Sequence, residues 1–349
     1  MFSNLTKRSF IMISIQFCKY HGAGNDFIVF DNRGDVYSLT DETRRHMCDR
    51  HFGIGADGIV EIKLSQSDDF KVIYYNADGK VGSLCGNGCR CALAYAKSLG
   101  IVSFAGTLGD CALENPECQG QSVYTFEAST GRHVGIIQET VKRGVNLVEY
   151  FVKFGDFLAS DIKQYNAEEF YINTGSPHHV KFITNELENM NVFKAGRKLS
   201  YELYGDKGSN INFVQSKRDN QTIKVTDEHS PETWVKAKDN NVLYVRTYER
   251  GVENETLACG TGAVAIALIQ HAKDANVINM ALNSQTSDAS SNTERVELVR
   301  ITIEMKGGKL TVTFKAVIND QGPSVLYKDV YLSGPAQYVF RGVYEMPQD

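Results

Sequence analysis

The sequence carries one short pattern twice, as Leu84-Cys85-Gly86-Asn87-Gly88 and as Ala258-Cys259-Gly260-Thr261-Gly262. Each copy precedes an apolar, alanine-rich run, residues 91–96 in the first copy and 263–268 in the second. The pattern therefore predicts a glycine-containing loop that leads into a helix. A cysteine at the start of a helix lies in a positive field that favours the thiolate. Two such cysteines predict one thiol on each face of a bound substrate, which suits removal of a proton from a carbon and its return from the other side.

Composition limits the class of protein. The chain has 349 residues, of which 42% are hydrophobic and 23% charged, and its formal net charge is −5. This length favours two domains. No Lys/Arg cluster is long enough to indicate a nucleic-acid partner, and no apolar run reaches the ~20 residues of a membrane span. We therefore expect a cytoplasmic protein that acts on a small molecule, with residues 1–12 as a disordered extension.

The cysteines are too sparse for a disulfide scaffold, since there are eight in the whole chain. Cys85, Cys89 and Cys91 resemble a metal cluster at first sight, but no matching Cys-x-x-Cys or His pair lies at zinc spacing. No metal is predicted.

The order of predicted elements is similar in the two halves of the chain. In the first half we expect strands over 14–20, 27–31, 59–64, 70–76, 123–127, 134–138 and 147–153, and a helix over 40–51. In the second half we expect strands over 171–174, 210–215, 242–248, 296–305, 309–318 and 325–333, a helix over 186–193 and a loop over 194–200. Many strands in hairpins around few helices predict an α+β fold. Residues 103–122 and 284–293 are predicted to be an irregular insertion and a polar loop.

The repeated plan predicts two related domains with a cleft between them. We place the first at 13–152, joined by the C-terminal segment 334–349, and the second at 153–333. Within the cleft, one thiolate and one thiol on opposite faces would invert an α-carbon, provided that the carbanion is held and water is excluded. The unpaired backbone N–H groups at the two helix starts can bind the substrate carboxylate, whose negative charge grows as the proton leaves. This route needs no organic cofactor.

Other polar residues stand beside the two loops or at the ends of predicted strands. Glu249 and Arg250 form either a clamp for charged substrate groups or a surface pair. His178, after Pro177, is either a polar lining residue or a packing residue. Three asparagines at strand-to-turn junctions are either turn residues or substrate ligands: Asn25, Asn76 and Asn210.

These segments together resemble the diaminopimelate epimerases. The resemblance is carried by Tyr20-His21-Gly22-Ala23-Gly24-Asn25-Asp26-Phe27, Gly53-Ile54-Gly55-Ala56-Asp57-Gly58, Asn76-Ala77-Asp78-Gly79, Cys85-Gly86-Asn87-Gly88-Cys89-Arg90-Cys91, Gly175-Ser176-Pro177-His178, Asn210-Ile211-Asn212-Phe213, Glu249-Arg250-Gly251 and the second Cys-Gly pattern. It implies a cofactor-independent isomerase that interconverts LL- and meso-diaminopimelate in lysine and peptidoglycan-precursor synthesis. It also implies two pseudo-symmetric domains, each a curled, mostly antiparallel sheet around a central helix, and a homodimer.

The resemblance assigns roles to residues. Cys85 and Cys259 are the acid/base pair. Asn25, Asn76 and Asn210 hold the distal end of the substrate, and Glu249 and Arg250 lie near its ammonium and carboxylate groups. The remaining substrate-binding residues are the helix-start donors and the segment before the second sheet: Gly86, Asn87, Gly260, Thr261, Ser176 and His178.

The chain departs from the family at three places. Ser176 replaces a frequent Asn, Gly58 replaces a Gln of some members, and one extra residue lies between Arg250 and Cys259, so that loop must bulge. Two alternatives also remain. Proline racemases and hydroxyproline epimerases share the two-cysteine plan, but typically carry His in place of Asn87. A non-catalytic binding protein of the same fold would bind a ligand without turnover.

Overall fold

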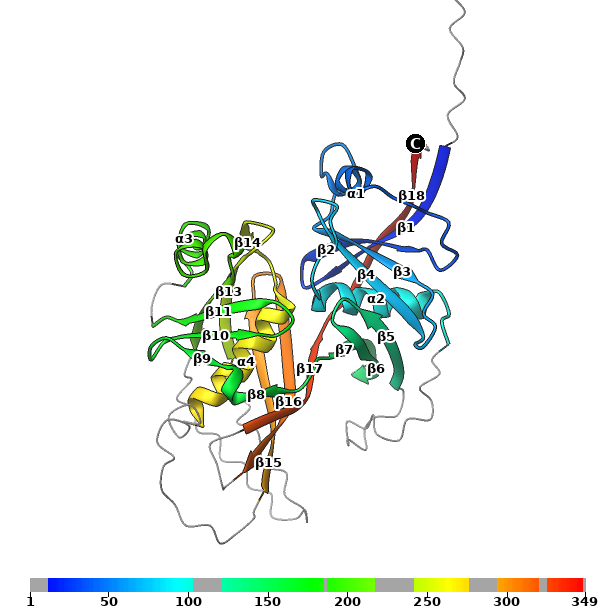
Figure 1. The fold of residues 1–349 in the computed structure, drawn as a ribbon. Coiled ribbons are helices and arrows are strands. Elements are labelled where there is room, and N and C mark those ends of the chain that lie inside the picture. Colours follow the sequence, from blue (N-terminus) through cyan, green and yellow to red (C-terminus); the bar gives the residue numbers. More distant parts are fainter. Residues whose placement is uncertain are drawn as a thin grey trace, which may run out of the picture.

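The computed structural model describes residues 12–102, 121–142, 144–184, 187–216, 242–275, 294–319 and 325–347. Residues 1–11 of the extension predicted over 1–12, residues 103–120 of the first insertion and the loop over 284–293 lie outside these ranges, whereas Met12 begins a strand. The described residues form four α-helices and a long mixed sheet, arranged as two lobes side by side (Figure 1). The helices are α1 (Asp41–Cys48), α2 (Gly86–Ser98), α3 (Val192–Tyr204) and α4 (Gly260–Asp274). None of the described helices is long and apolar enough to cross a membrane.

The first set of strands surrounds α2. Its order in the sheet is β18, β1, β2, β3, β4, β5, β6, β7, in which β2/β3 and β4/β5 are parallel and the other neighbours antiparallel. The bounds are β1 (Met12–Gly22), β2 (Asn25–Asp31), β3 (Gly58–Lys63), β4 (Phe70–Asn76), β5 (Gln121–Ala128), β6 (Gly131–Lys142), β7 (Val145–Lys153) and β18 (Gln337–Pro347).

The second set surrounds α4 and repeats the same succession of pairings. Its order is β9, β10, β11, β12, β13, β15, β16, β17, β8, in which β11/β12 and β13/β15 are parallel. The bounds are β8 (Phe157–Leu158), β9 (Lys163–Gln164), β10 (Glu169–Asn173), β11 (Pro177–Phe182), β12 (Asn210–Ser216), β13 (Val242–Glu249), β14 (Asn254–Thr256), β15 (Glu294–Met305), β16 (Gly308–Asn319) and β17 (Val325–Gly334). Pairing of β17 with β7 joins the two sets.

The two central helices account for the apolar runs after the Cys-Gly patterns. Every residue of α4 from Gly260 to Ala272 is buried, as is every residue of α2 from Gly86 to Ala96. A helix that is apolar all round is stable only when it is enclosed. α2 packs against β1, β2, β6 and β7, and α4 against β11, β16 and β17. Each cysteine pattern therefore lies at the start of a core helix, as predicted.

The prediction of a helix over 186–193 and a loop over 194–200 was wrong. α3 begins at Val192, because the Asn191 side chain accepts a hydrogen bond of 2.9 Å from the backbone N–H of Lys194 and so caps the helix. Gly196 lies inside the helix, in the segment that was predicted to be a loop. A Cβ atom at Gly196 would lie 2.3 Å from Cβ of Tyr248, so the glycine allows α3 to pack closely on β13.

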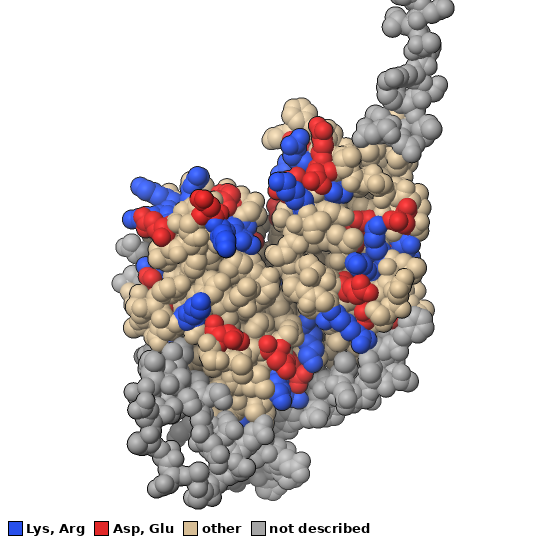
Figure 2. All heavy atoms as spheres, in the orientation of Figure 1, with Lys and Arg blue, Asp and Glu red and all other residues tan. Residues whose placement is uncertain are grey.

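Five strands were not predicted, namely β8, β9, β11, β14 and β18. β18 pairs with β1 from Met12 opposite Pro347 to His21 opposite Gln337, and β11 begins at the proline that suggested a turn. Most pairings are antiparallel, and the fold has the mixed helix and sheet content that the sequence predicted in outline. Figure 2 shows a hollow between the two lobes and a mixture of positive and negative side chains over this face.

Candidate active site

The two pattern cysteines are the N-cap residues of the two central helices. Cys85 precedes α2 and Cys259 precedes α4. The helix starts meet at their first residues, because a Cβ atom at Gly260 would lie 3.3 Å from Cα of Gly86. A side chain at Gly260 would therefore crowd the start of α2. The fold therefore brings together two cysteines that are 174 positions apart in the sequence.

Burial outweighs the helix field at both thiols. Burial raises the pKa of Cys85 to about 12, although the backbone N–H of Gly88, 3.4 Å from its Sγ, opposes the rise. Burial, reinforced by the nearby Glu249 carboxylate, raises the pKa of Cys259 well above its usual value. The sequence predicted the helix field correctly, but both thiols are protonated near neutral pH in this structure because desolvation is the larger effect.

Asn25 connects the start of α2 with a partly buried network of ion pairs. Its Oδ1 accepts a hydrogen bond of 3.0 Å from Nδ2 of Asn87 and lies 3.9 Å from Sγ of Cys85. Its Nδ2 donates to Asp57 at 2.8 Å. Since a carboxylate only accepts and the Asn87 amide nitrogen only donates, the orientation of the Asn25 amide is fixed, with its oxygen towards the thiol.

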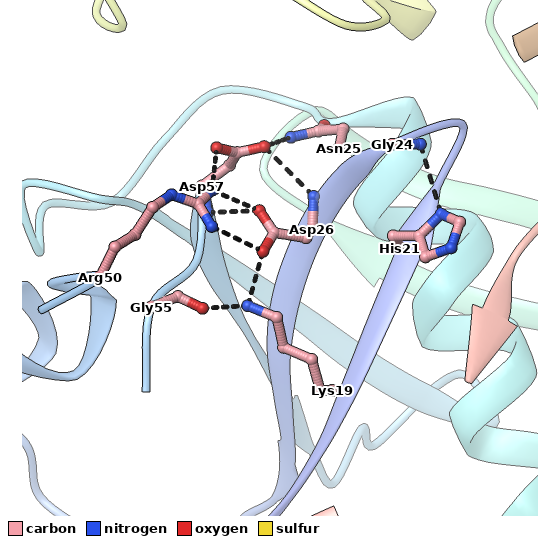
Figure 3. A network of polar contacts seen from close by, with 8 residues as sticks. All are labelled: Lys19, His21, Gly24, Asn25, Asp26, Arg50, Gly55 and Asp57. Atoms are coloured by element: carbon pink, nitrogen blue, oxygen red, sulfur yellow. Dashed lines mark hydrogen bonds and ion pairs between the residues drawn. The ribbon is translucent and has the colours of Figure 1, made fainter. Parts of the chain in front are cut away.

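The network that holds Asp57 is drawn in Figure 3. Arg50 donates to both Asp57 and Asp26, at 2.8 and 2.7 Å. Lys19 pairs with Asp26 at 2.7 Å and also donates to the carbonyl of Gly55. Burial alone raises the pKa of Asp26, but hydrogen bonds from Arg50 and Lys19 lower it to about 2. These pairs tie the turn that carries Asn25 to the glycine loop of residues 53–58.

A buried polar chain lies beside Cys259. Nδ2 of Asn212 donates to the His179 carbonyl at 3.0 Å and lies 3.2 Å from Nδ1 of His178. His178 therefore accepts at Nδ1 and donates through Nε2 to Oγ1 of Thr261, at 2.8 Å. Oγ1 of Thr261 lies 3.6 Å from Sγ of Cys259. Burial lowers the pKa of His178 to about 3, so the imidazole is neutral.

Glu249 and Arg250 lie at the end of β13, on the side of Cys259. Burial raises the pKa of Glu249 to about 7, although hydrogen bonds with Thr256, at 2.5 Å, and with Cys259 oppose the rise. The backbone N–H of Arg250 donates to Oδ1 of Asn210 at 2.9 Å. The end of β13 therefore places the Glu249 carboxyl group, which can exchange a proton near neutral pH, beside the Cys259 thiol.

Comparisons with known proteins agree with this geometry. The family model described as diaminopimelate epimerase matches residues 17–108 and 170–338. A diaminopimelate epimerase of Flavobacterium psychrophilum is 36% identical over 326 residues, which cover 92% of this chain and 97% of that protein. One from Chlorobaculum tepidum is 35% identical and covers 92% and 98%. The chain belongs to the diaminopimelate epimerase family. The isomerase class predicted from the sequence is confirmed.

Solved structures share the fold of this diaminopimelate epimerase family member. A hydroxyproline epimerase from Agrobacterium vitis has a TM-score of 0.55 and 12% identity, over 96% of this chain and 92% of that one. A phenazine biosynthesis protein of the PhzF family from Bacillus anthracis has a TM-score of 0.54 and 13% identity, over 95% and 99%. At such identities the likeness concerns the fold alone.

The predicted site residues of this family member fall into two groups. Cys85, Gly86, Asn87 and Asn25 lie together at the start of α2. The others on the second lobe lie together around the start of α4 and the ends of β11, β12 and β13: Cys259, Gly260, Thr261, Ser176, His178, Asn210, Glu249 and Arg250. Asn76 ends β4, opposite Gly58 in the register.

The loop after Arg250, which was predicted to bulge, turns back tightly into β14. Glu253 has a positive φ of 56°, and its carboxylate accepts hydrogen bonds from the hydroxyls of Tyr201 and Tyr248 at 2.6 and 2.7 Å. Glu249 still pairs with Asn254 in the β13/β14 register. Glu249 therefore keeps a regular position in the strand next to this loop.

Three residues that the sequence did not single out also contact the site: Asp57, Arg90 and Asn212. All three stand inside segments that carried the resemblance, but no role was assigned to them. One signal could have indicated Asn212: it is a polar residue between Ile211 and Phe213 in a predicted strand. An amide in a buried strand needs hydrogen-bond partners.

Proposed function

We propose that the chain epimerises LL-diaminopimelate to meso-diaminopimelate by two-base proton transfer at the α-carbon, with Cys85 and Cys259 as the acid/base pair. The observation that supports this most is the meeting of two cysteine-capped helix starts at Gly86 and Gly260. A substrate α-carbon between the two sulfur atoms would have one on each face.

The proton balance is simple. A thiolate takes the α-proton and becomes a thiol, while the opposite thiol gives its proton to the other face and becomes a thiolate. The backbone N–H groups of the helix starts stabilise the carboxylate as its charge grows. Because both thiols are neutral at rest, one must first lose a proton. Glu249, which shares a hydrogen bond with Cys259 and has a pKa of about 7, is the group that can accept it.

We also propose substrate contacts for the other residues of the two groups. The asparagine side chains of Asn25, Asn76 and Asn210, with Ser176, would hold the distal amino-acid end. Arg250 would pair with a carboxylate of the substrate, and Thr261 with His178 would orient donors near Cys259.

The architecture and assembly are proposed from strand pairing. Repetition of the pairing order supports two domains, 13–152 with 334–349 and 153–333. We propose a homodimer through β18, which among the described strands pairs with β1 alone and exposes Tyr338, Phe340 and Val343. A monomer in sedimentation equilibrium at assay concentration would contradict this. The cytoplasmic location stays a prediction, which cell fractionation tests.

The test is proton NMR of the reduced protein with LL-diaminopimelate in D2O. We expect loss of the α-proton signal and appearance of the meso isomer. Cys85→Ala and Cys259→Ala should each abolish epimerisation, whereas Cys48→Ala, at a buried cysteine outside the site, should retain it. Full activity of either site variant would exclude the two-thiol mechanism. Exchange at proline, with none at diaminopimelate, would favour the related racemases.

A further inference from the structure

Arg90 is a fully buried cation at the start of α2. Its exposed fraction is 0%. Its guanidinium donates to Oδ1 of Asn87 at 2.8 Å, to the carbonyl of Pro335 at 3.3 Å and to the carbonyl of Gly86 at 3.4 Å. All three partners are neutral, and no carboxylate of the described residues lies within ion-pair distance of it. A buried charge without a counter-ion destabilises the folded state.

The other half of the molecule shows that the fold does not require this charge. Arg90 is the fifth residue after the N-cap Cys85, and Val264 is the fifth residue after the N-cap Cys259. Val264 is also 0% exposed. An apolar side chain therefore fills the equivalent position on the equivalent helix, which makes a purely structural role for the arginine unnecessary.

Two glycines make room for the guanidinium. A Cβ atom at Gly22, the last residue of β1, would lie 3.2 Å from Nη2 of Arg90. A Cβ atom at Gly334, the last residue of β17, would lie 3.4 Å from its Cζ. The two strand ends therefore close over the guanidinium and keep it from water.

The guanidinium acts on the site through Asn87. Because Arg90 only donates, Oδ1 of Asn87 must face it, and Nδ2 of Asn87 is left to donate to Asn25 and, at 2.9 Å, to the carbonyl of Ala258. The last bond reaches the residue before Cys259. The positive charge of Arg90 also lowers the pKa of Cys85, against the larger effect of burial.

We propose that Arg90 is a positioning residue of the epimerase site, which locks Asn87 across the junction of the two helix starts and supplies buried positive charge that stabilises anionic groups there. The anions are the Cys85 thiolate and a substrate carboxylate. This inference rests on the proposed function, but its effect on Cys85 is measurable without substrate.

The test compares Arg90→Met, which removes the charge at similar length, with Arg90→Lys, which keeps it. Val264→Ala is the matched control for altered packing at the equivalent helix position. The first readout is carboxamidomethylation by iodoacetamide, a neutral reagent, with Cys85 and Cys259 followed separately by peptide mass spectrometry between pH 7 and 9. The second is kcat and KM for epimerisation.

We expect Arg90→Met to slow alkylation of Cys85 by roughly 10-fold, the change in thiolate for one pKa unit, while Cys259 in the same molecule changes much less. We expect kcat to fall by roughly 10- to 100-fold. Arg90→Lys should recover most of the Cys85 rate, and Val264→Ala should leave the Cys85 rate and kcat near wild type.

Equal slowing at both cysteines, or in Val264→Ala, would indicate a structural role and overturn the proposal, as would an unchanged Cys85 rate in folded Arg90→Met. If Arg90→Met does not fold, Arg90→Gln takes its place in the same comparison, because it removes the charge and keeps a side-chain N–H donor for Oδ1 of Asn87. Wild-type protein that turns over no diaminopimelate would refute the proposed function, while the alkylation series would still test Arg90.

Discussion

Replacement of Glu249 by Gln should change how stability depends on pH. The folded-state pKa of Glu249 is about 7, against an ordinary 4.5, so the difference is about 2.5 units. At about 1.4 kcal/mol for each unit, ionising this buried carboxyl group destabilises the folded state by about 3 kcal/mol. The folded state binds the proton more tightly than the unfolded state. The stability contribution is therefore present below pH 4.5 and is lost as the pH rises through 7.

The assay is urea unfolding of wild type and Glu249→Gln in the absence of substrate, between pH 4 and 8. The difference between the two proteins isolates this carboxyl group from all others. We expect the free energy of unfolding of the wild type, relative to the variant, to fall by about 3 kcal/mol over this range and to level off above pH 8. A difference that stays constant with pH would refute the reasoning.

Glu255 supplies a control of opposite sign on the next strand. Burial raises the pKa of Glu255, but hydrogen bonds from Arg246 and Lys306 outweigh it and lower the pKa below the ordinary value. Its stabilisation is present above the unfolded-state pKa and is lost as the pH falls. The wild type should therefore gain stability relative to Glu255→Gln as the pH rises. Slopes of the same sign for both variants would show that the pH effect does not come from these carboxyl groups.

Three further predictions concern helix contacts and the loop after Arg250. Gly260→Ala places a Cβ atom 3.3 Å from Cα of Gly86, closer than an ordinary contact, which pushes the helix starts apart, so kcat should fall by roughly 100-fold with an unchanged circular dichroism spectrum; an unchanged kcat would contradict this. Asn191→Ala removes the cap of α3 and should lower the free energy of unfolding by about 1 kcal/mol in urea without altering kcat. Glu253→Gln weakens the bonds to two tyrosines and should raise KM more than it lowers kcat, in steady-state assays, because the loop that carries Arg250 loses its anchor.

The core helices could be predicted because their signal is local. A Cys-Gly-x-Gly pattern followed by an apolar run specifies a capped, enclosed helix, and α2 and α4 begin at the expected residues. α3 could not be placed in the same way. Its glycine is tolerated because Tyr248 packs against it, which is a contact between positions 52 residues apart. The low helix propensity of glycine argues against a helix at this position, although the tertiary contact stabilises one.

The polar contacts of the site could not be predicted for a similar reason, because they join residues far apart in the sequence. Asn25 meets Asp57 across 32 positions, and Asn87 meets Ala258 across 171. The pKa of each thiol also depends on tertiary structure. A helix start is visible in the sequence, but the extent to which the folded chain excludes water from Cys85 is not, and this second quantity sets the direction of the shift.

Repetition of the strand plan makes the differences between the halves informative. In the register, Phe27 and Gly58 occupy the positions that His178 and Asn210 occupy in the second half, and Val60 faces Tyr74 where Asn212 faces Thr247. Both halves have the same strand pairing. Only the second half has a chain of hydrogen-bonded side chains at these positions, which leads from Asn212 through His178 and Thr261 to Cys259. The first half instead adds the Arg90 charge behind Cys85. Two equivalent backbones can therefore present two thiols in matched positions and still surround them with unlike electrostatics, a carboxyl group beside one and a guanidinium behind the other.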